Sequence, residues 1–138
     1  AEVLAVADVF EDRVANVVKK YGLDASKGHH GYESYRKVTE SDAEFVLMAT
    51  PPNFRPVHFE ASVNAGKHCF VEKPVAVDPV GARKVIDVGE LAKQKGLTVV
   101  AGTQRRYEKK YLETKARVDA GAVGSILGGV ISWNGRVP

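Results

Sequence analysis

The tripeptide Glu72-Lys73-Pro74 directly follows a short apolar run, residues 68–71. That run lies between Gly66 and a long amphipathic segment that begins near Pro79, which predicts a buried parallel strand. In open α/β sheets, ligands bind just outside the carboxyl ends of such strands. A lysine and a glutamate held there by a proline are placed for chemistry rather than for packing, and Lys73 is the candidate catalytic residue.

A second polar segment, Thr50-Pro51-Pro52-Asn53, follows the strand predicted at 45–49. Its two consecutive prolines stiffen the loop and remove two backbone donors, so that a flat ring can lie against it. The alternative is a plain turn into the next helix. His58 comes five residues after Asn53, and by itself it favours a structural role over a catalytic one.

Asp8 ends the first predicted strand, residues 2–7. A carboxylate there can accept both hydroxyls of an adenosine ribose, and it would repel the 2′-phosphate of NADP. The alternative is a cap for the helix predicted at 11–21. None of the 13 glycines forms the G-x-G-x-x-G fingerprint that normally precedes such an aspartate.

Gln104 and Arg105 follow the strand predicted at 97–101. A planar guanidinium at this position can stack on a nicotinamide or hold a substrate oxygen, although a basic start to a surface helix explains it equally well. The segment 133–136 leaves a similar choice between the beginning of a substrate pocket and a strand end with a buried tryptophan.

The composition, 44% hydrophobic and 27% charged over 138 residues, is that of a globular domain with a real core. The basic residues of 105–117 alternate with acidic ones, which indicates a solvated helix face and no nucleic-acid partner. No apolar stretch reaches the roughly 18 residues of a membrane helix, and no set of histidines, cysteine and carboxylates has metal-ligand spacing. The sequence opens at Ala1 without a starting Met, so any targeting segment can be missing from it; a cytoplasmic location is favoured, with export to the periplasm as the alternative.

Predicted strands alternate with predicted helices along the chain, which is typical of an α/β fold with a parallel sheet and helices on both faces. The connections fit right-handed crossovers. The strands are predicted at 2–7, near 29–30, and at 45–49, 68–71, 97–101 and 126–133, and the helices at 11–21, 32–39, 56–65, 79–95 and 108–119.

In content and order, several segments resemble the Gfo/Idh/MocA oxidoreductases, the family of glucose-fructose oxidoreductase and inositol dehydrogenase. The resemblance covers essentially the whole chain, and it is carried by residues 7–13, 49–58, 65–68, 72–74 and 102–106. It implies a Rossmann-like dinucleotide-binding domain at 1–122 and, at 123–138, the start of a C-terminal α/β domain. In that family the second domain carries most substrate contacts and the subunit interface, so we expect a homo-oligomer in the full-length protein.

The resemblance also assigns roles to single residues. Asp8 matches the acidic residue that contacts the adenosine ribose, and Thr50 to Asn53 match the loop beside the nicotinamide, with His58 in the helix that follows. Glu72, Lys73 and Pro74 match the family's EKP signature, in which the lysine lies near both nicotinamide and substrate hydroxyl and the proline is often cis. Gln104 and Arg105 match positions that face the nicotinamide.

These roles imply an NAD(P)-dependent oxidoreductase that moves a hydride between nicotinamide and a hydroxyl-bearing carbon of a sugar or polyol. Asp8 favours NAD over NADP as the cofactor. Two alternatives within the fold are a non-catalytic nucleotide-sensing regulator and a glycosidase that uses tightly held NAD. Lys73 favours an enzyme over a sensor.

Two parts of the family pattern are not in this sequence: the glycine-rich phosphate loop, and the second domain with its D-x-x-x-H pair. In the strand order 3-2-1-4-5-6, the first strand lies between those predicted here at 2–7 and 45–49. We therefore expect a fragment of a longer enzyme, with an incomplete doubly wound sheet that has two unpaired edges.

Overall fold

The computed structural model describes residues 2–132 and 134. The chain forms two compact units, the first ending at Gly102 and the second beginning at Thr103. The domain boundary predicted at 122 stays a prediction.

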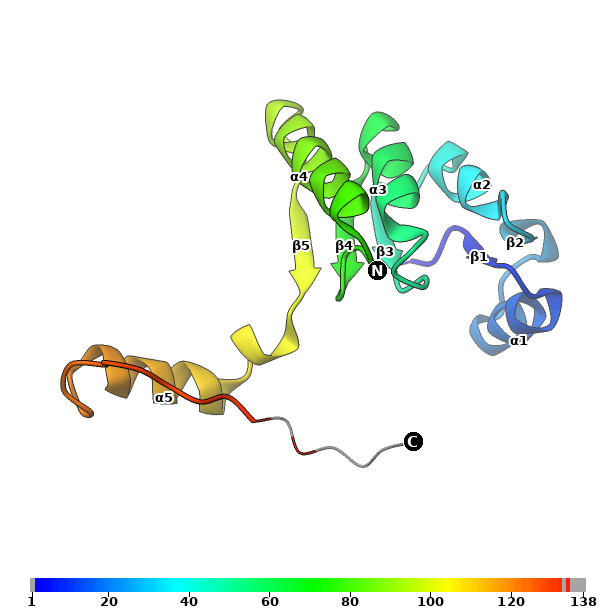
Figure 1. Ribbon diagram of the computed structural model, residues 1–138. Helices are drawn as coiled ribbons and strands as arrows, with labels where there is room; N and C mark the ends of the chain where they lie inside the picture. The colour runs from blue at the N-terminus through cyan, green and yellow to red at the C-terminus, as the bar shows by residue number, and fades with distance from the viewer. Residues whose placement is uncertain (1, 133, 135–138) are drawn as a thin grey trace. The chain divides into compact units, whose positions relative to one another are not determined.

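The first unit contains two parallel sheets (Figure 1). Strand β1 (Val6–Asp8) pairs with β2 (Gly28–His30). Strands β3 (Phe45–Met48), β4 (His68–Glu72) and β5 (Val99–Gly102) form the other sheet, in the order β3-β4-β5. Every pairing is parallel, which confirms the predicted α/β class.

Helices connect these strands, and their ends lie within two residues of the predicted ones. The helices of this unit are α1 (Glu11–Tyr21), α2 (Ser34–Glu40), α3 (Arg55–Asn64) and α4 (Pro79–Gln94), with a short 3₁₀ turn at Ala25–Lys27. Gly22 ends α1 in the left-handed conformation, with φ 63°, which only glycine adopts at little cost. Asp78 caps α4 by accepting a hydrogen bond of 2.6 Å from the Gly81 N–H.

The core of the first unit lies on one face of the β3-β4-β5 sheet. Val46, Met48, Cys69 and Val71 alternate inward along β3 and β4 and pack against α3 and α4, which contribute Phe59, Val63, Val88 and Ala92. On the opposite face Leu47 is 69% exposed. Helices on both faces were predicted, but α3 and α4 both cover the same face, because two successive right-handed crossovers that extend a sheet in one direction fall on one side.

Around β1 and β2 the prediction of two covered faces holds. Both α1 and α2 contact both strands, and Figure 1 shows them on opposite sides of the pair. In α4 the buried residues are Val88 and Ala92, whereas Ile86 is 66% exposed.

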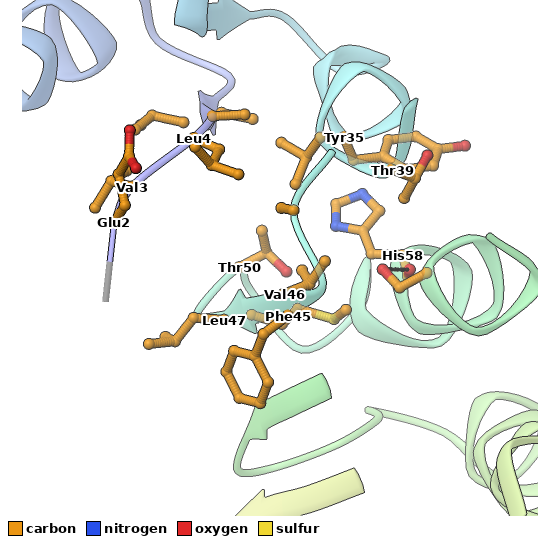
Figure 2. Close-up of a pocket in the computed structure, with 17 residues that line it drawn as sticks. Glu2, Val3, Leu4, Tyr35, Thr39, Phe45, Val46, Leu47, Thr50 and His58 are labelled. Carbon is orange, nitrogen blue, oxygen red and sulfur yellow. Dashed lines mark hydrogen bonds between the residues drawn. The ribbon is translucent and has the colours of Figure 1, made fainter. Parts of the chain in front are cut away.

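Strands β1 and β3 belong to different sheets, as the strand-order argument predicted. A cavity of about 410 Å³ lies between them. Figure 2 shows Val3 and Leu4 on one side of it and Phe45 to Leu47 on the other, with Tyr35 and His58 contributed by α2 and α3.

The second unit consists of a 3₁₀ turn (Gln104–Arg106), helix α5 (Lys109–Asp119) and a segment without helix or strand in its described part, 120–132 and 134. The strand predicted at 126–133 is therefore wrong for 126–132, and Trp133 and Arg136 lie outside the described residues. Leu127 is 97% exposed. An alternating apolar pattern forms a strand only where a neighbour supplies hydrogen bonds and a packing surface.

Candidate functional site

The predicted site residues of the first unit lie where its strands end. A cavity of about 580 Å³ opens between the ends of β1 and β3. It is lined by Ala7, Asp8, Val9, Phe10, Arg13, Tyr32, Leu47, Ala49, Thr50, Pro51, Phe54 and His58. The fold thus brings Asp8 together with Thr50, Pro51 and His58, whereas Pro52 and Asn53 are not among the residues of its wall.

Asp8 is held by the turn that follows β1. Its Oδ1 atom accepts a hydrogen bond of 2.9 Å from the Phe10 N–H, and its carbonyl oxygen accepts one of 3.1 Å from the Gly31 N–H. The N-cap residue of α1 is Phe10, and no side chain caps that helix. The alternative of a helix cap is therefore wrong: Asp8 orders a tight turn of its own, and its Oδ2 atom makes no hydrogen bond with the described residues.

A row of rings forms another part of the wall with Tyr32, Phe54 and His58, and Tyr35 of the same row lines the neighbouring cavity. His58 stacks on Tyr35, with centroids 4.3 Å apart and planes at 22°, and on Phe54, at 5.9 Å and 11°. Tyr32 continues the row beside Phe54, at 6.1 Å. Burial lowers the pKa of His58, and the Glu33 carboxylate opposes this shift, so the ring is neutral near pH 7. Rings of this kind offer a flat planar ligand a stacking surface.

The Thr50 hydroxyl oxygen is buried and has no hydrogen-bond partner among the described residues. Thr50 lines both cavities, and Figure 2 shows it among the side chains around the cavity between β1 and β3. A buried polar atom without a partner costs free energy unless a ligand or water satisfies it. Asp8, Thr50 and the stacked rings thus meet at one cavity, and their roles toward the ribose and the nicotinamide stay predictions.

Glu72 and Lys73, at the end of β4, have different surroundings. The Glu72 carboxylate lies over Gly102 of β5, where an added Cβ would meet its Oε2 atom at 2.7 Å, and the same oxygen accepts a 3.1 Å hydrogen bond from the Lys73 N–H. The Lys73–Pro74 bond is cis, as the resemblance implied. The Lys73 side chain is exposed and makes no hydrogen bond or ion pair with the described residues.

Gln104 and Arg105 belong to the second unit, where Arg105 donates a hydrogen bond to the Tyr111 hydroxyl and lies 5.2 Å from the ring centroid. Their predicted role beside the nicotinamide stays a prediction. Sequence reasoning missed Phe10 and Arg13, although their place in the turn and first helical turn after Asp8 was a usable signal, because both face the same strand end.

The described residues hold no group of histidine, cysteine and carboxylate side chains that could bind a metal ion. Among the described helices, none combines the length and the apolar character needed to cross a bilayer.

Comparison with known proteins assigns the chain to a family. Residues 1–103 match the model of the Gfo/Idh/MocA oxidoreductase family, described as having an NAD-binding Rossmann fold. The chain belongs to this family. The segments that include the EKP signature and Asp8 predicted this membership, and the family match confirms it.

Curated relatives include inositol 2-dehydrogenases. The enzyme from Salmonella paratyphi B is 31% identical over 126 residues, which cover 91% of this chain and 36% of the relative. The Pseudomonas fluorescens enzyme is 35% identical over 130 residues, covering 92% and 36% respectively. The chain thus spans about 36% of the length of the curated relatives it matches.

Among solved structures, the chain is similar to scyllo-inositol dehydrogenase from Lactobacillus casei with bound NAD(H) and scyllo-inositol. The TM-score is 0.74 at 25% identity, over 90% of this chain and 35% of the other. The Rossmann-like fold predicted from the sequence is therefore confirmed.

Proposed function

We propose that this chain is the cofactor-binding part of an NAD(P)-dependent oxidoreductase that acts on a hydroxyl group of a polyol or sugar, with NAD preferred. The observation that carries the proposal is the placement of Asp8, Thr50 and Lys73 at the ends of parallel strands in a member of an NAD-binding family. Ligands of open α/β sheets bind at this edge.

Asp8 supplies the acceptor for the adenosine ribose, because its Oδ1 atom is already fixed by Phe10 and its Oδ2 atom makes no hydrogen bond within the described part of the chain. A carboxylate so placed disfavours the added phosphate of NADP. Thr50 supplies a hydroxyl that needs a partner, and the rings of Phe54 and His58 supply a flat apolar wall.

Lys73 acts on the substrate. Its amine is exposed at the end of β4 and makes no bond with the described residues, so it can hold the reacting hydroxyl by a hydrogen bond and take or return its proton. The nicotinamide supplies the redox chemistry when it is bound. The polyol class is favoured because the relatives are inositol 2-dehydrogenases and one similar structure holds scyllo-inositol.

The test uses the full-length protein with NAD and a set of inositol isomers, linear polyols and aldoses, followed by the absorbance of reduced nicotinamide. We expect turnover of at least one cyclic polyol. Lys73→Ala should lower kcat by about 10²-fold or more, as expected for a positioned proton-transfer group, while the Kd for NAD changes by less than about threefold.

Lys93→Ala, an exposed lysine in the last turn of α4, is the matched control and should keep the wild-type kcat. A protein that binds neither NAD nor NADP would refute the proposed function. Wild-type turnover by Lys73→Ala would refute the catalytic role of that lysine.

A further inference from the structure

Arg55 is a buried charged residue whose position is not explained by the stability of its helix. It is the first residue of α3 and only 6% exposed. The positive end of the helix dipole disfavours a cation there, and burying a guanidinium is costly unless it is paired. Among the described residues no ion pair involves Arg55, and its Nε atom is buried without a partner.

The guanidinium instead reaches the loop that carries Lys73. It donates a hydrogen bond to the carbonyl oxygen of Pro74, the residue after Lys73. Residues 73–77 contain no helix or strand, and in the described part of the chain no other side chain from a different element hydrogen-bonds to 74–77. Arg55 therefore ties the start of α3 to the loop that follows β4.

Both ends of this tether are firmly held. Pro56, the next residue, is buried, and an added Cβ at Gly81 of α4 would lie 3.1 Å from its Cγ atom. The beginnings of α3 and α4 are thus in close contact, which fixes the backbone from which Arg55 extends. On the other side, the loop follows directly after Glu72, the last residue of β4, which pairs with Gly102 of β5.

We propose that Arg55 is a positioning residue that holds the Lys73 loop in the geometry required for proton transfer. The inference rests on the proposed oxidoreductase function. Arg55 does not line the cavity between the ends of β1 and β3, so its removal should disturb the placement of Lys73 and leave cofactor binding nearly unchanged. A displacement of about 1 Å at a reacting group can cost about 10²-fold in rate.

The first test compares two substitutions in the full-length protein. Arg55→Met keeps a long apolar side chain and removes the donors; we expect kcat to fall by about 10- to 100-fold with less than about a threefold change in the Kd for NAD. Arg55→Lys keeps a charged donor that can reach the Pro74 carbonyl, so it should restore part of the lost kcat.

The matched control is Lys95→Met, which removes the same kind of bond at the opposite end of α3. Lys95 Nζ donates to the carbonyl oxygens of Val63 and Asn64, each at 3.1 Å. This variant should keep the wild-type kcat. If Arg55→Met also keeps it in an active enzyme, the proposal is overturned.

Hydrogen exchange provides a second readout that does not depend on activity. In Arg55→Met, the amides of Lys73 and of residues 75–78 should exchange faster, while β3 and β4 keep their protection. Unchanged exchange in this loop would overturn the proposal that Arg55 holds it. A loss of protection throughout the first unit would also overturn it, because that result would show a role in folding. A wild-type protein without NAD(P)-dependent turnover would refute the proposed function, and the exchange result would then judge the tether separately.

Discussion

Asp8 and Arg13 place opposite charges on the wall of one cavity. The carboxylate is fixed by the Phe10 N–H, and the Arg13 guanidinium lies 4.7 Å from the centroid of the Phe10 ring. Phe10 therefore orders both groups. The balance between the two charges decides how the site treats an extra phosphate on the ribose, because a carboxylate repels it and a guanidinium binds it.

We predict that Asp8→Ser shifts cofactor preference from NAD toward NADP. Loss of the carboxylate removes the repulsion, and Arg13 remains to pair with the 2′-phosphate. The wild-type full-length protein should bind NAD more tightly than NADP, and the variant should narrow or reverse that ratio in a fluorescence titration. The double variant Asp8→Ser/Arg13→Ala should lose the gain for NADP. Tighter binding of NADP by the wild type would contradict the prediction.

His58 gives the fold a dependence on pH. Burial lowers its pKa in the folded chain below the ordinary value of 6.5, so the unfolded chain takes up a proton first as the pH falls. The free energy of unfolding should therefore decrease from pH 6.5 downward and continue to do so through the folded-state pKa. Urea denaturation of His58→Phe, which keeps a ring between Tyr35 and Phe54, should show a smaller slope in this range. An equal slope in both proteins would refute the assignment; His30→Gln, an exposed histidine, is the control.

At this scale the sequence predicted the polar residues better than their surroundings. Asp8, Thr50 and Lys73 were found because strand ends in an open α/β sheet are known ligand positions. Tyr32 and Phe54 were missed, because their stacking with His58 depends on how α2 packs beside α3. Arg55 was missed because its hydrogen bond joins residues 19 positions apart, a distance that no local pattern encodes.

The contact between Glu72 of β4 and Gly102 of β5 connects the sheet to Lys73, the proposed proton-transfer residue. The absent side chain at Gly102 leaves room for the Glu72 carboxylate, which in turn accepts the Lys73 N–H. The carboxylate is the far end of a flexible side chain. A methyl group at position 102 would therefore move Glu72 rather than break the ladder.

We predict that Gly102→Ala lowers kcat of the full-length protein several-fold while its unfolding free energy changes by less than about 1 kcal/mol. Gly89→Ala is the control: an added Cβ there has no neighbour within 4 Å, so it should retain kcat and stabilise α4 by about 0.5–1 kcal/mol. Urea denaturation and steady-state kinetics give the two quantities. Unaltered kcat in Gly102→Ala would show that the Glu72 position does not matter for turnover.

For helices with clear capping residues, the sequence predicted the first and last residues to within a few positions. The cap at Asp78 and the glycine after α1 fix backbone conformation locally, so the sequence alone carries that information. The strand at 126–133 failed because strand formation depends on a neighbouring strand. Periodicity alone does not determine which residues of α4 face inward: Val88 is buried and Ile86 is 66% exposed, because this depends on how α4 packs beside α3.

For the whole molecule, the separation of β1-β2 from β3-β4-β5 leaves two unpaired strand edges on either side of one cavity. The sequence order of strands was sufficient to predict this break, because a doubly wound sheet places its first strand between them. The sequence could not predict which side chains surround this break. The ends of β1 and β3 line one cavity, and aromatic rings form part of its wall.

We predict that these 138 residues by themselves bind NAD negligibly, although the full-length protein binds it well. A dinucleotide's pyrophosphate normally rests on a glycine-rich turn at a helix N-terminus, where free N–H groups and the helix dipole attract it, and none of the 13 glycines forms that turn. Asp8 offers a contact to the adenosine ribose, and the segments near residues 50, 72 and 105 offer contacts to the nicotinamide half, but neither set holds the pyrophosphate. Calorimetry of the 138-residue chain against NAD, with adenosine as the comparison ligand, measures both contributions. Weak binding of both ligands is expected, because the pyrophosphate of NAD finds no glycine-rich turn in this chain. Micromolar NAD binding would mean that another group in this chain holds the pyrophosphate, and Asp8→Ser would then show whether the ribose contact still contributes.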